Sequence, residues 1–119
     1  MEKPFSAYKG SEPFTFVCYA HRDSAVVYQD IALLHEKNVN IWYDEGIPAG
    51  SSWRSEIATA ISGADKLLFF ISERSLESAH CMREVRFALD NDIDILPVYL
   101  ESCTLPAELA LALGGVHAL

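Results

Sequence analysis

The sequence predicts an α/β domain in which helices cover both faces of a central, parallel, five-stranded sheet. Short runs rich in β-branched and aromatic residues alternate with segments whose apolar residues recur at helical spacing. Strict alternation of strand and helix implies right-handed crossovers, and therefore a parallel sheet between two layers of helices. In addition, residues 66–71 form a nearly unbroken apolar run, as expected of a central strand that is buried on both faces.

The expected elements follow one another from near residue 13 to the last residue. The strands are expected over residues 14–19, 39–43, 66–71, 93–100 and 116–119. The first helix is expected to follow Asp23, whose side chain can cap it. The next helices are expected to begin at Trp53 and at Ser75 or Ser78, with a short last helix over residues 106–113. Their buried faces are predicted from apolar residues at helical spacing, namely Val27, Ile31 and Leu34; Trp53, Ile57, Ala60 and Ile61; and Cys81, Val85, Ala88 and Leu89.

A chain of 119 residues has the usual size of a single domain, here expected over residues 13–119 after a polar leader at residues 1–12. Half of the residues are hydrophobic and 22% are charged, which suits a packed core and argues against disorder. The last expected strand has no helix after it. We therefore expect the chain to be a piece of a longer, multidomain protein.

Charge and cysteine content disfavour several kinds of partner. Nine Lys and Arg residues against seventeen Asp and Glu residues give a net charge of −8, which argues against binding to nucleic acid. The sequence has no apolar stretch long enough for a membrane span and no signal peptide, so we expect a cytoplasmic protein that binds no membrane. Three cysteines without a Cys-x-x-Cys spacing favour reduced thiols and predict no metal site.

Several enzyme motifs are absent from the sequence. It has no Gly-x-Gly-x-x-Gly or Gly-x-x-x-x-Gly-Lys turn to hold phosphates, and no Gly-x-Ser-x-Gly nucleophile elbow. A phospho-accepting receiver domain would share the architecture, but it would need an aspartate at the end of the third strand, where this chain has Ser72. These classes of protein are therefore disfavoured.

The candidate site lies on the loops after Tyr19, Tyr43 and Ile71, because parallel sheets bind ligands at the carboxyl ends of their strands. Glu84 falls on the border of the buried stripe of the third helix, at the rim of that crevice. The sequence leaves two interpretations of this carboxylate open. It is either a surface or capping residue, which is the commoner case, or an anion that faces a pocket and stabilises developing positive charge.

Four motifs stand in order along the chain. They are FVCYAHRD at residues 16–23, WYDEGIPAG at residues 42–50, Ser78-x-x-Cys81-x-x-Glu84, and ILPV at residues 95–98. Together they resemble Toll/interleukin-1 receptor (TIR) domains, in particular the bacterial ones. The first is similar to their first conserved box, the second to their BB loop, the third to the helix that carries the family's catalytic glutamate, and the fourth to their fourth strand.

The resemblance implies a flavodoxin-like three-layer sandwich. It also implies cleavage of NAD at the nicotinamide–ribose bond, to give nicotinamide and ADP-ribose or a cyclic isomer, as in many bacterial and plant members of the family. Glu84 matches the catalytic glutamate of those members. NAD would be a substrate, so the resemblance implies no cofactor.

Other positions are assigned through the same resemblance. The residues that match the wall or edge of the family's substrate pocket are Tyr19, Ala20, His21, Ser78 and His80. Of these, His80 departs from the family, since many NAD-cleaving members carry Trp there. An imidazole gives a smaller stacking surface than an indole, which bears on the rate and on the choice between hydrolysis and cyclisation.

The BB loop of the family commonly mediates self-association, and the matching residues are Asp44, Gly46, Ile47, Pro48 and Gly50. The resemblance thus implies an enzyme that is activated when a fused sensor or effector domain drives it to oligomerise, in bacteria for anti-phage immunity. The alternative is a non-catalytic signalling module that acts through TIR–TIR association. A nucleoside deoxyribosyltransferase-like enzyme, with the same fold and N-glycosidic chemistry, fits the motifs less well.

Overall fold

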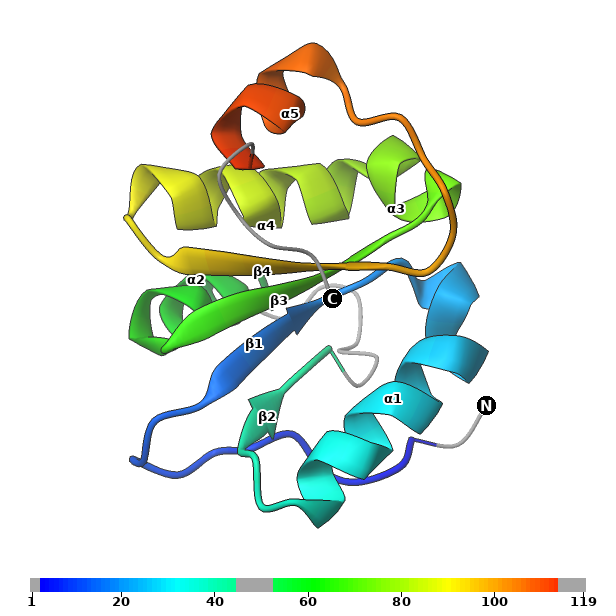
Figure 1. Cartoon of the computed structure of the whole chain (residues 1–119). Coiled ribbons are helices and arrows are strands. Elements are labelled where there is room, and N and C mark those ends of the chain that lie inside the picture. The colour runs from blue at the N-terminus through cyan, green and yellow to red at the C-terminus, as the bar shows by residue number, and fades with distance from the viewer. Residues whose placement is uncertain (1–2, 45–52, 114–119) are drawn as a thin grey trace.

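Strands and helices alternate along residues 3–44 and 53–113, the part of the chain that the computed structural model describes (Figure 1). In chain order the elements are β1 (Thr15–Cys18), the 3-10 turn η1 (His21–Asp23), α1 (Ser24–Glu36), β2 (Ile41–Trp42), α2 (Trp53–Gly63), β3 (Lys66–Ile71), α3 (Glu73–Glu77), α4 (Ala79–Asp90), β4 (Asp94–Tyr99) and α5 (Ala107–Leu113). None of these helices is long and apolar enough to cross a membrane.

The strands pair in the order β2–β1–β3–β4, and every pair is parallel. Phe16 of β1 lies opposite Trp42 of β2 on one side and opposite Leu67 of β3 on the other. The chain moves outward from β1 to β2 and then crosses back to β3, so the order of strands reverses between β1 and β3. Parallel sheets bind ligands beside such a reversal, at the carboxyl ends of the strands.

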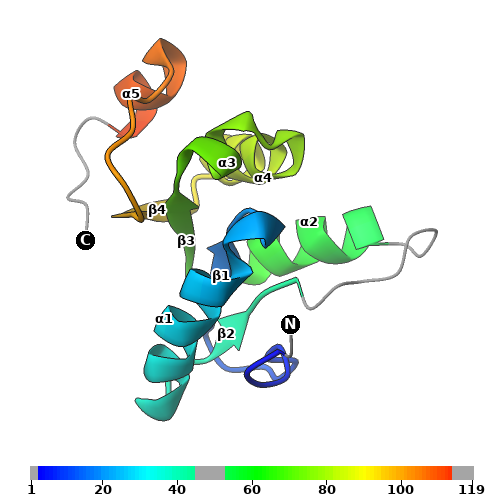
Figure 2. The ribbon, with the colours of Figure 1, turned by 90° about the vertical axis from the view of Figure 1, so that its right-hand side faces the viewer.

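Helices cover both faces of the sheet. Helix α1 packs on one face, while α2 and α4 lie side by side on the other (Figures 1 and 2). This arrangement follows from right-handed crossovers, because the step from β1 to β2 and the step from β2 to β3 run in opposite directions across the sheet. The predicted parallel sheet between two layers of helices is therefore confirmed.

The number of strands differs from the prediction. The described residues form four strands rather than five, and the fifth predicted strand, residues 116–119, lies outside the described residues. Strand β4 is thus an edge of the described sheet. It contains Pro97, and proline is tolerated at a sheet edge because the N–H that it lacks is not needed there.

The core is centred on β3, as its apolar sequence predicts. Its residues from Leu67 to Ile71 are at most 4% exposed. The predicted helix faces are buried or half-buried at their described positions except Leu89, where the prediction is wrong, since this residue is 37% exposed. The side chain of Trp53 lies outside the described residues. Leu89 follows the fully buried Ala88 by about 100° around the helix, which carries it past the edge of the stripe that faces the sheet.

Two serines start helices after β3. The Ser72 hydroxyl accepts a hydrogen bond from the Ser75 N–H at 3.0 Å and begins the short helix α3, which the sequence did not separate from the helix that follows. Ser78 then begins α4, because its hydroxyl accepts a hydrogen bond from the Cys81 N–H at 3.2 Å. These two caps fix the turn that carries the start of α4 toward the carboxyl ends of the strands.

Candidate functional site

The turn after β1 is held against the end of β2. The Tyr19 hydroxyl donates a hydrogen bond to the Asp44 carbonyl oxygen at 2.8 Å and lies 3.4 Å from the Tyr28 hydroxyl. Burial raises the pKa of Tyr19, so its hydroxyl stays protonated and remains a donor. Ala20 is also buried, and its backbone carbonyl oxygen accepts a hydrogen bond from the Asp23 N–H at 2.8 Å.

His21 stands out into solvent from this turn. Its ring stacks on Tyr19 at 5.3 Å between centroids, and its Nε2 lies 3.2 Å from Asp44 Oδ2. The hydrogen bond to Asp44 raises the pKa of His21. The contact between His21 and Asp44 joins the ends of β1 and β2 at the rim of the site, and it becomes an ion pair when His21 is protonated.

Glu84 lies in the second turn of α4, within electrostatic reach of this pair. Burial is the largest cause that raises the pKa of Glu84 to about 8, and repulsion from Cys81 and Asp44 adds to it. Hydrogen bonding by the Cys18 thiol and the nearby His21 oppose the rise. A carboxyl group with such a pKa is a candidate functional group, since ordinary surface glutamates ionise near 4.5.

A pocket of about 270 Å³ opens between α2 and α4, and Glu84 lines it. The side chains around the pocket are Arg54, Ile57, Ala58 and Ile61 from α2, and His80, Arg83, Glu84 and Phe87 from α4. Ligand pockets have volumes of roughly 300–1,000 Å³, so this pocket lies just below the lower end of that range. Glu84 thus stands between the pocket and the end of β1.

The structure brings together some of the predicted site residues and separates others. Tyr19, His21 and Asp44 form one cluster, and His80 lies one turn before Glu84 in the wall of the pocket. Ser78 is not among the pocket-lining residues, and its hydroxyl is used to cap α4. Gly46, Ile47, Pro48 and Gly50 lie outside the described residues.

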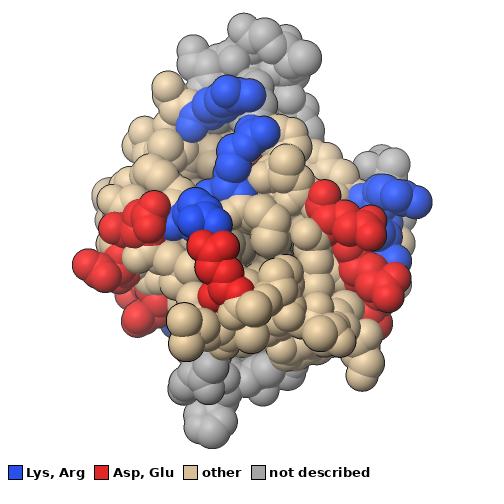
Figure 3. Space-filling view, turned by 90° about the horizontal axis from the view of Figure 1, so that it is seen from above, with Lys and Arg blue, Asp and Glu red and all other residues tan. Residues whose placement is uncertain are grey.

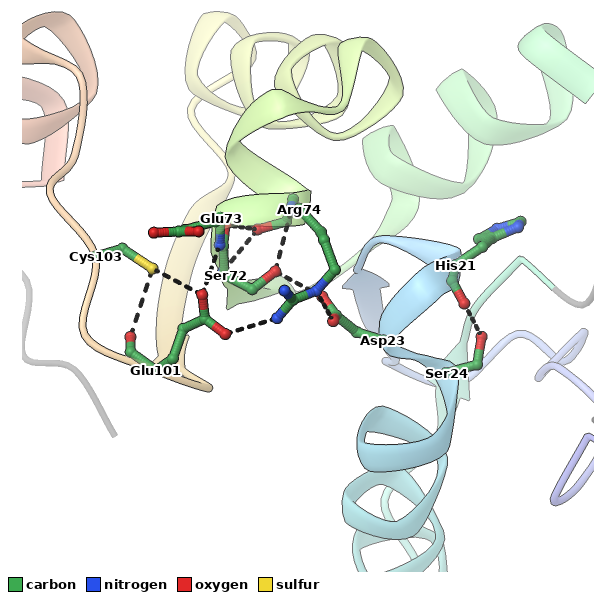
Figure 4. Close-up of polar contacts among 9 residues, drawn as sticks. His21, Asp23, Ser24, Ser72, Glu73, Arg74, Glu101 and Cys103 are labelled. Atoms are coloured by element: carbon green, nitrogen blue, oxygen red, sulfur yellow. Dashed lines mark hydrogen bonds and ion pairs between the residues drawn. The ribbon is translucent and has the colours of Figure 1, made fainter.

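A buried polar network beside the site was missed by the sequence analysis (Figure 4). Asp23 is only 7% exposed, and its carboxylate accepts hydrogen bonds from Ser72 Oγ at 2.6 Å and from Arg74 Nε at 2.5 Å. Arg74 also pairs with Glu101 at 2.6 Å. The network ties together the ends of β1, β3 and β4.

The network also corrects the role predicted for Asp23. Asp23 does precede α1, but its side chain makes no capping hydrogen bond, because both carboxylate oxygens are bound by Ser72 and Arg74. Its partners are 49 and 51 residues away along the chain, and no local sequence pattern indicates such a contact. Across residues 3–44 and 53–113, no group of three or more His, Cys, Asp or Glu side chains is placed to hold a metal ion.

Comparison with solved structures shows which fold these residues share. The TIR domain of a Toll-related receptor, TRR-2 from Hydra magnipapillata, is similar with a TM-score of 0.74 at 18% identity, over 88% of this chain and 81% of that one. The TIR domains of the activated Roq1 resistosome are similar with a TM-score of 0.62 at 20% identity, over 74% of this chain and 57% of that one. A metazoan TIR-STING receptor from C. gigas is similar with a TM-score of 0.70 at 18% identity, over 89% of this chain and 38% of that one.

At these identities the structural matches establish the fold. Comparison with curated protein sequences gives no match. The family model described as "TIR domain" matches residues 15–119, which include β1 with its exit turn, Glu84 and the pocket between α2 and α4. The chain therefore belongs to the TIR-domain family.

Proposed function

We propose that this TIR domain cleaves NAD at the nicotinamide–ribose bond and that Glu84 is its catalytic residue. One observation carries the proposal: a carboxyl group with a strongly raised pKa lines a pocket and lies within electrostatic reach of His21 and Asp44. A merely solvated glutamate would have neither property. The crevice beside Glu84 is the feature that a catalytic domain needs and a pure interaction module does not.

A single carboxylate is enough for this reaction. Nicotinamide leaves the cationic ring of NAD as a neutral base, so the leaving group needs no proton, unlike the oxygen of an ordinary glycoside. The bond's electron pair goes to the ring nitrogen, and positive charge develops on the ribose. Ionised Glu84 would stabilise that charge. Water that adds to the ribose carbon and releases a proton gives ADP-ribose, whereas attack by a nucleophile of the same molecule gives a cyclic isomer.

The pH profile of cleavage is expected to follow the ionisation of Glu84. The active form is the carboxylate, and the pKa of the free group is about 8. We therefore expect kcat/KM for NAD to rise about tenfold per pH unit up to pH 8 and to level off above it. Because His21 lowers this pKa, His21→Gln should move the plateau to higher pH. A profile that is flat between pH 5 and 9 would rule out Glu84 as the ionising group.

Assembly is expected to control the activity. TIR domains self-associate, and one structural neighbour is the TIR-domain part of an activated resistosome. We propose that self-association completes the site and that the protein serves in immune defence, in the manner of the family's bacterial members. A fused sensor or effector domain in the full-length protein would drive that assembly.

The test of the proposal is nicotinamide release from NAD by the purified chain over a 100-fold range of protein concentration. Release per molecule is expected to increase with concentration if assembly completes the site. Strict proportionality between rate and concentration would remove assembly from the proposal. If no nicotinamide is released at any concentration, even when a fused scaffold holds the chains together, the proposal that this domain cleaves NAD is wrong.

A non-catalytic signalling module is the second candidate, and His80 is the observation that favours it. His80 lines the pocket four residues before Glu84, where an imidazole provides a smaller stacking surface for a base or a nicotinamide ring than an indole. His80→Trp separates the two candidates. The variant is expected to cleave NAD faster if the site is catalytic, and to remain inactive if the domain acts only through TIR–TIR contacts.

A further inference from the structure

The last residue of β1 is a cysteine that contacts the helix carrying Glu84. Cys18 is fully buried, and its thiol donates a hydrogen bond to the Cys81 carbonyl oxygen, with 3.7 Å between Sγ and the oxygen. Cys81 lies in the first turn of α4, where its N–H donates a hydrogen bond to the Ser78 hydroxyl. The Cys18 thiol therefore lies at the point where β1 meets the start of α4.

The side chain of Glu84 reaches back to the same point. Glu84 follows Cys81 by three residues, so the two side chains are neighbours on one face of α4. Side chains of a helix point toward its N-terminus and cover the turn before their own Cα. The carboxyl group of Glu84 therefore lies near the turn that the Cys18 thiol contacts. Because Glu84 also lines the pocket, this contact connects the end of β1 with the pocket.

The Cys18 thiol acts as a hydrogen-bond donor. Burial raises the pKa of Cys18 well above its ordinary value, so the thiol keeps its proton at neutral pH. A thiol has a single hydrogen to donate, and two acceptors compete for it, the Cys81 carbonyl oxygen and the Glu84 carboxyl group. A carboxylate is the stronger acceptor because it is charged. When Glu84 ionises, the thiol is therefore expected to turn from the carbonyl oxygen to the carboxylate.

Cys18 differs from the other groups that act on Glu84. Among the described residues, the titratable and charged groups that line the pocket or act on Glu84 are Cys81, His80 and Arg83 on α4, Arg54 on α2, His21 in η1 and Asp44 after β2. Figure 3 shows Lys, Arg, Asp and Glu side chains at the surface of one face, where solvent and salt screen their charges. Cys18 is uncharged and fully buried, so it acts on Glu84 through a hydrogen bond at short range.

We propose that Cys18 is a positioning residue for Glu84: its thiol donates a hydrogen bond to the ionised carboxylate and thereby sets how much of the active form exists at neutral pH. The inference rests on the proposed function and adds a residue that acts on the reaction through Glu84. Thiols are weak donors, so they stabilise the carboxylate only slightly. With a pKa of about 8, only about one Glu84 in ten is ionised at pH 7.

The test is a titration of Glu84 in the whole chain by carbon NMR, with the carboxyl carbons of glutamate isotope-labelled. The signal of Glu84 is the one that disappears in Glu84→Gln. Cys18→Ser replaces the thiol by a stronger donor of similar size, and the midpoint of the titration should fall by at least about 0.5 pH unit. Cys18→Val removes the donor and keeps the space filled, and the midpoint should rise by at least about 0.5 pH unit.

The matched control is Cys103→Ser, which makes the same exchange at a half-buried thiol beside Glu101 and should leave the titration of Glu84 unchanged. Opposite shifts in Cys18→Ser and Cys18→Val cannot come from disturbed packing alone, since both variants alter the same buried position. If one of them does not fold, Cys18→Ala is a second variant without a donor and should raise the midpoint. Unchanged midpoints in the folded variants, or shifts of serine and valine in the same direction, would overturn the positioning role.

Kinetics give an independent reading. At pH 7, kcat/KM for NAD should be at least about threefold higher in Cys18→Ser than in the unaltered chain, and at least about threefold lower in Cys18→Val. On the plateau at high pH the three chains should reach similar rates. If the titration shifts as expected but no chain cleaves NAD, Cys18 does control the ionisation of Glu84 and the proposed enzyme fails. If NAD is cleaved and the titration does not shift, the enzyme stands and the positioning role fails.

Discussion

Glu84→Gln is expected to reduce nicotinamide release from NAD by about 10³-fold or more, because the amide has no charge to stabilise the developing ribose cation. The amide keeps the size of the carboxyl group, so substrate can still enter the pocket. Release is best measured by chromatography at pH 8, where about half of the Glu84 carboxyl groups are ionised in the folded chain. Glu77→Gln, at the exposed end of α3, is the control and should retain full activity.

The same substitution is expected to make the fold more stable at pH 8. The pKa of Glu84 is about 8 in the folded chain against an ordinary value of 4.5, so the unfolded chain loses this proton first. Stability therefore falls as the pH rises from about 4.5 to about 8, and glutamine removes that loss. A thermal midpoint that rises while activity disappears would separate a catalytic role from unfolding.

Two other results would count against this role of Glu84. Nicotinamide release by Glu84→Gln at the wild-type rate would show that another group stabilises the ribose cation. A thermal midpoint that falls together with activity would show that Glu84 supports the fold. It would then be a structural glutamate, which is the commoner case at the border of a buried helix face. In either case the raised pKa would need another explanation than catalysis.

Local patterns were enough to predict the layers and the rim position of Glu84. Its place on α4 follows from the spacing of Cys81, Val85 and Ala88, which are all buried. The same periodicity failed at Leu89, because a stripe has an edge that sequence alone does not locate. The sequence also predicted that the loops after β1 and β2 lie at the same edge of the sheet, and Tyr19 and His21 do contact Asp44 after β2.

Contacts between distant segments could not be predicted in this way. The pocket is lined by side chains from two separate helices, and their coming together depends on how α2 packs against α4. Asp23 shows the same limit, since an Asp before a helix is ordinarily a cap. Its burial follows from Arg74, which reaches it from the start of α3 (Figure 4).

Arg74→Gln is expected to destabilise the fold more than Asp23→Asn, although both changes break the same ion pair. Without Arg74, the carboxylate of Asp23 remains 7% exposed with only the Ser72 hydroxyl bound to it. Without Asp23, the guanidinium of Arg74 is still 35% exposed and still paired with Glu101. We expect the thermal midpoint at pH 7 to fall by at least about 5 °C in Arg74→Gln and by less than half as much in Asp23→Asn.

The double variant Asp23→Asn/Arg74→Gln tests whether this difference comes from an uncompensated buried charge. Since it removes the carboxylate together with its counter-charge, its midpoint should lie above that of Arg74→Gln alone. Arg86→Gln breaks a pair in which both side chains are mostly exposed, and it should leave the midpoint unchanged. Equal losses in the two single variants, or a double variant that shows their sum, would mean that the network contributes hydrogen bonds but no charge pairing. If the charges do pair, Arg74 of α3 holds in place the turn that carries Asp23 and His21. The edge of the pocket then depends on the packing of α3.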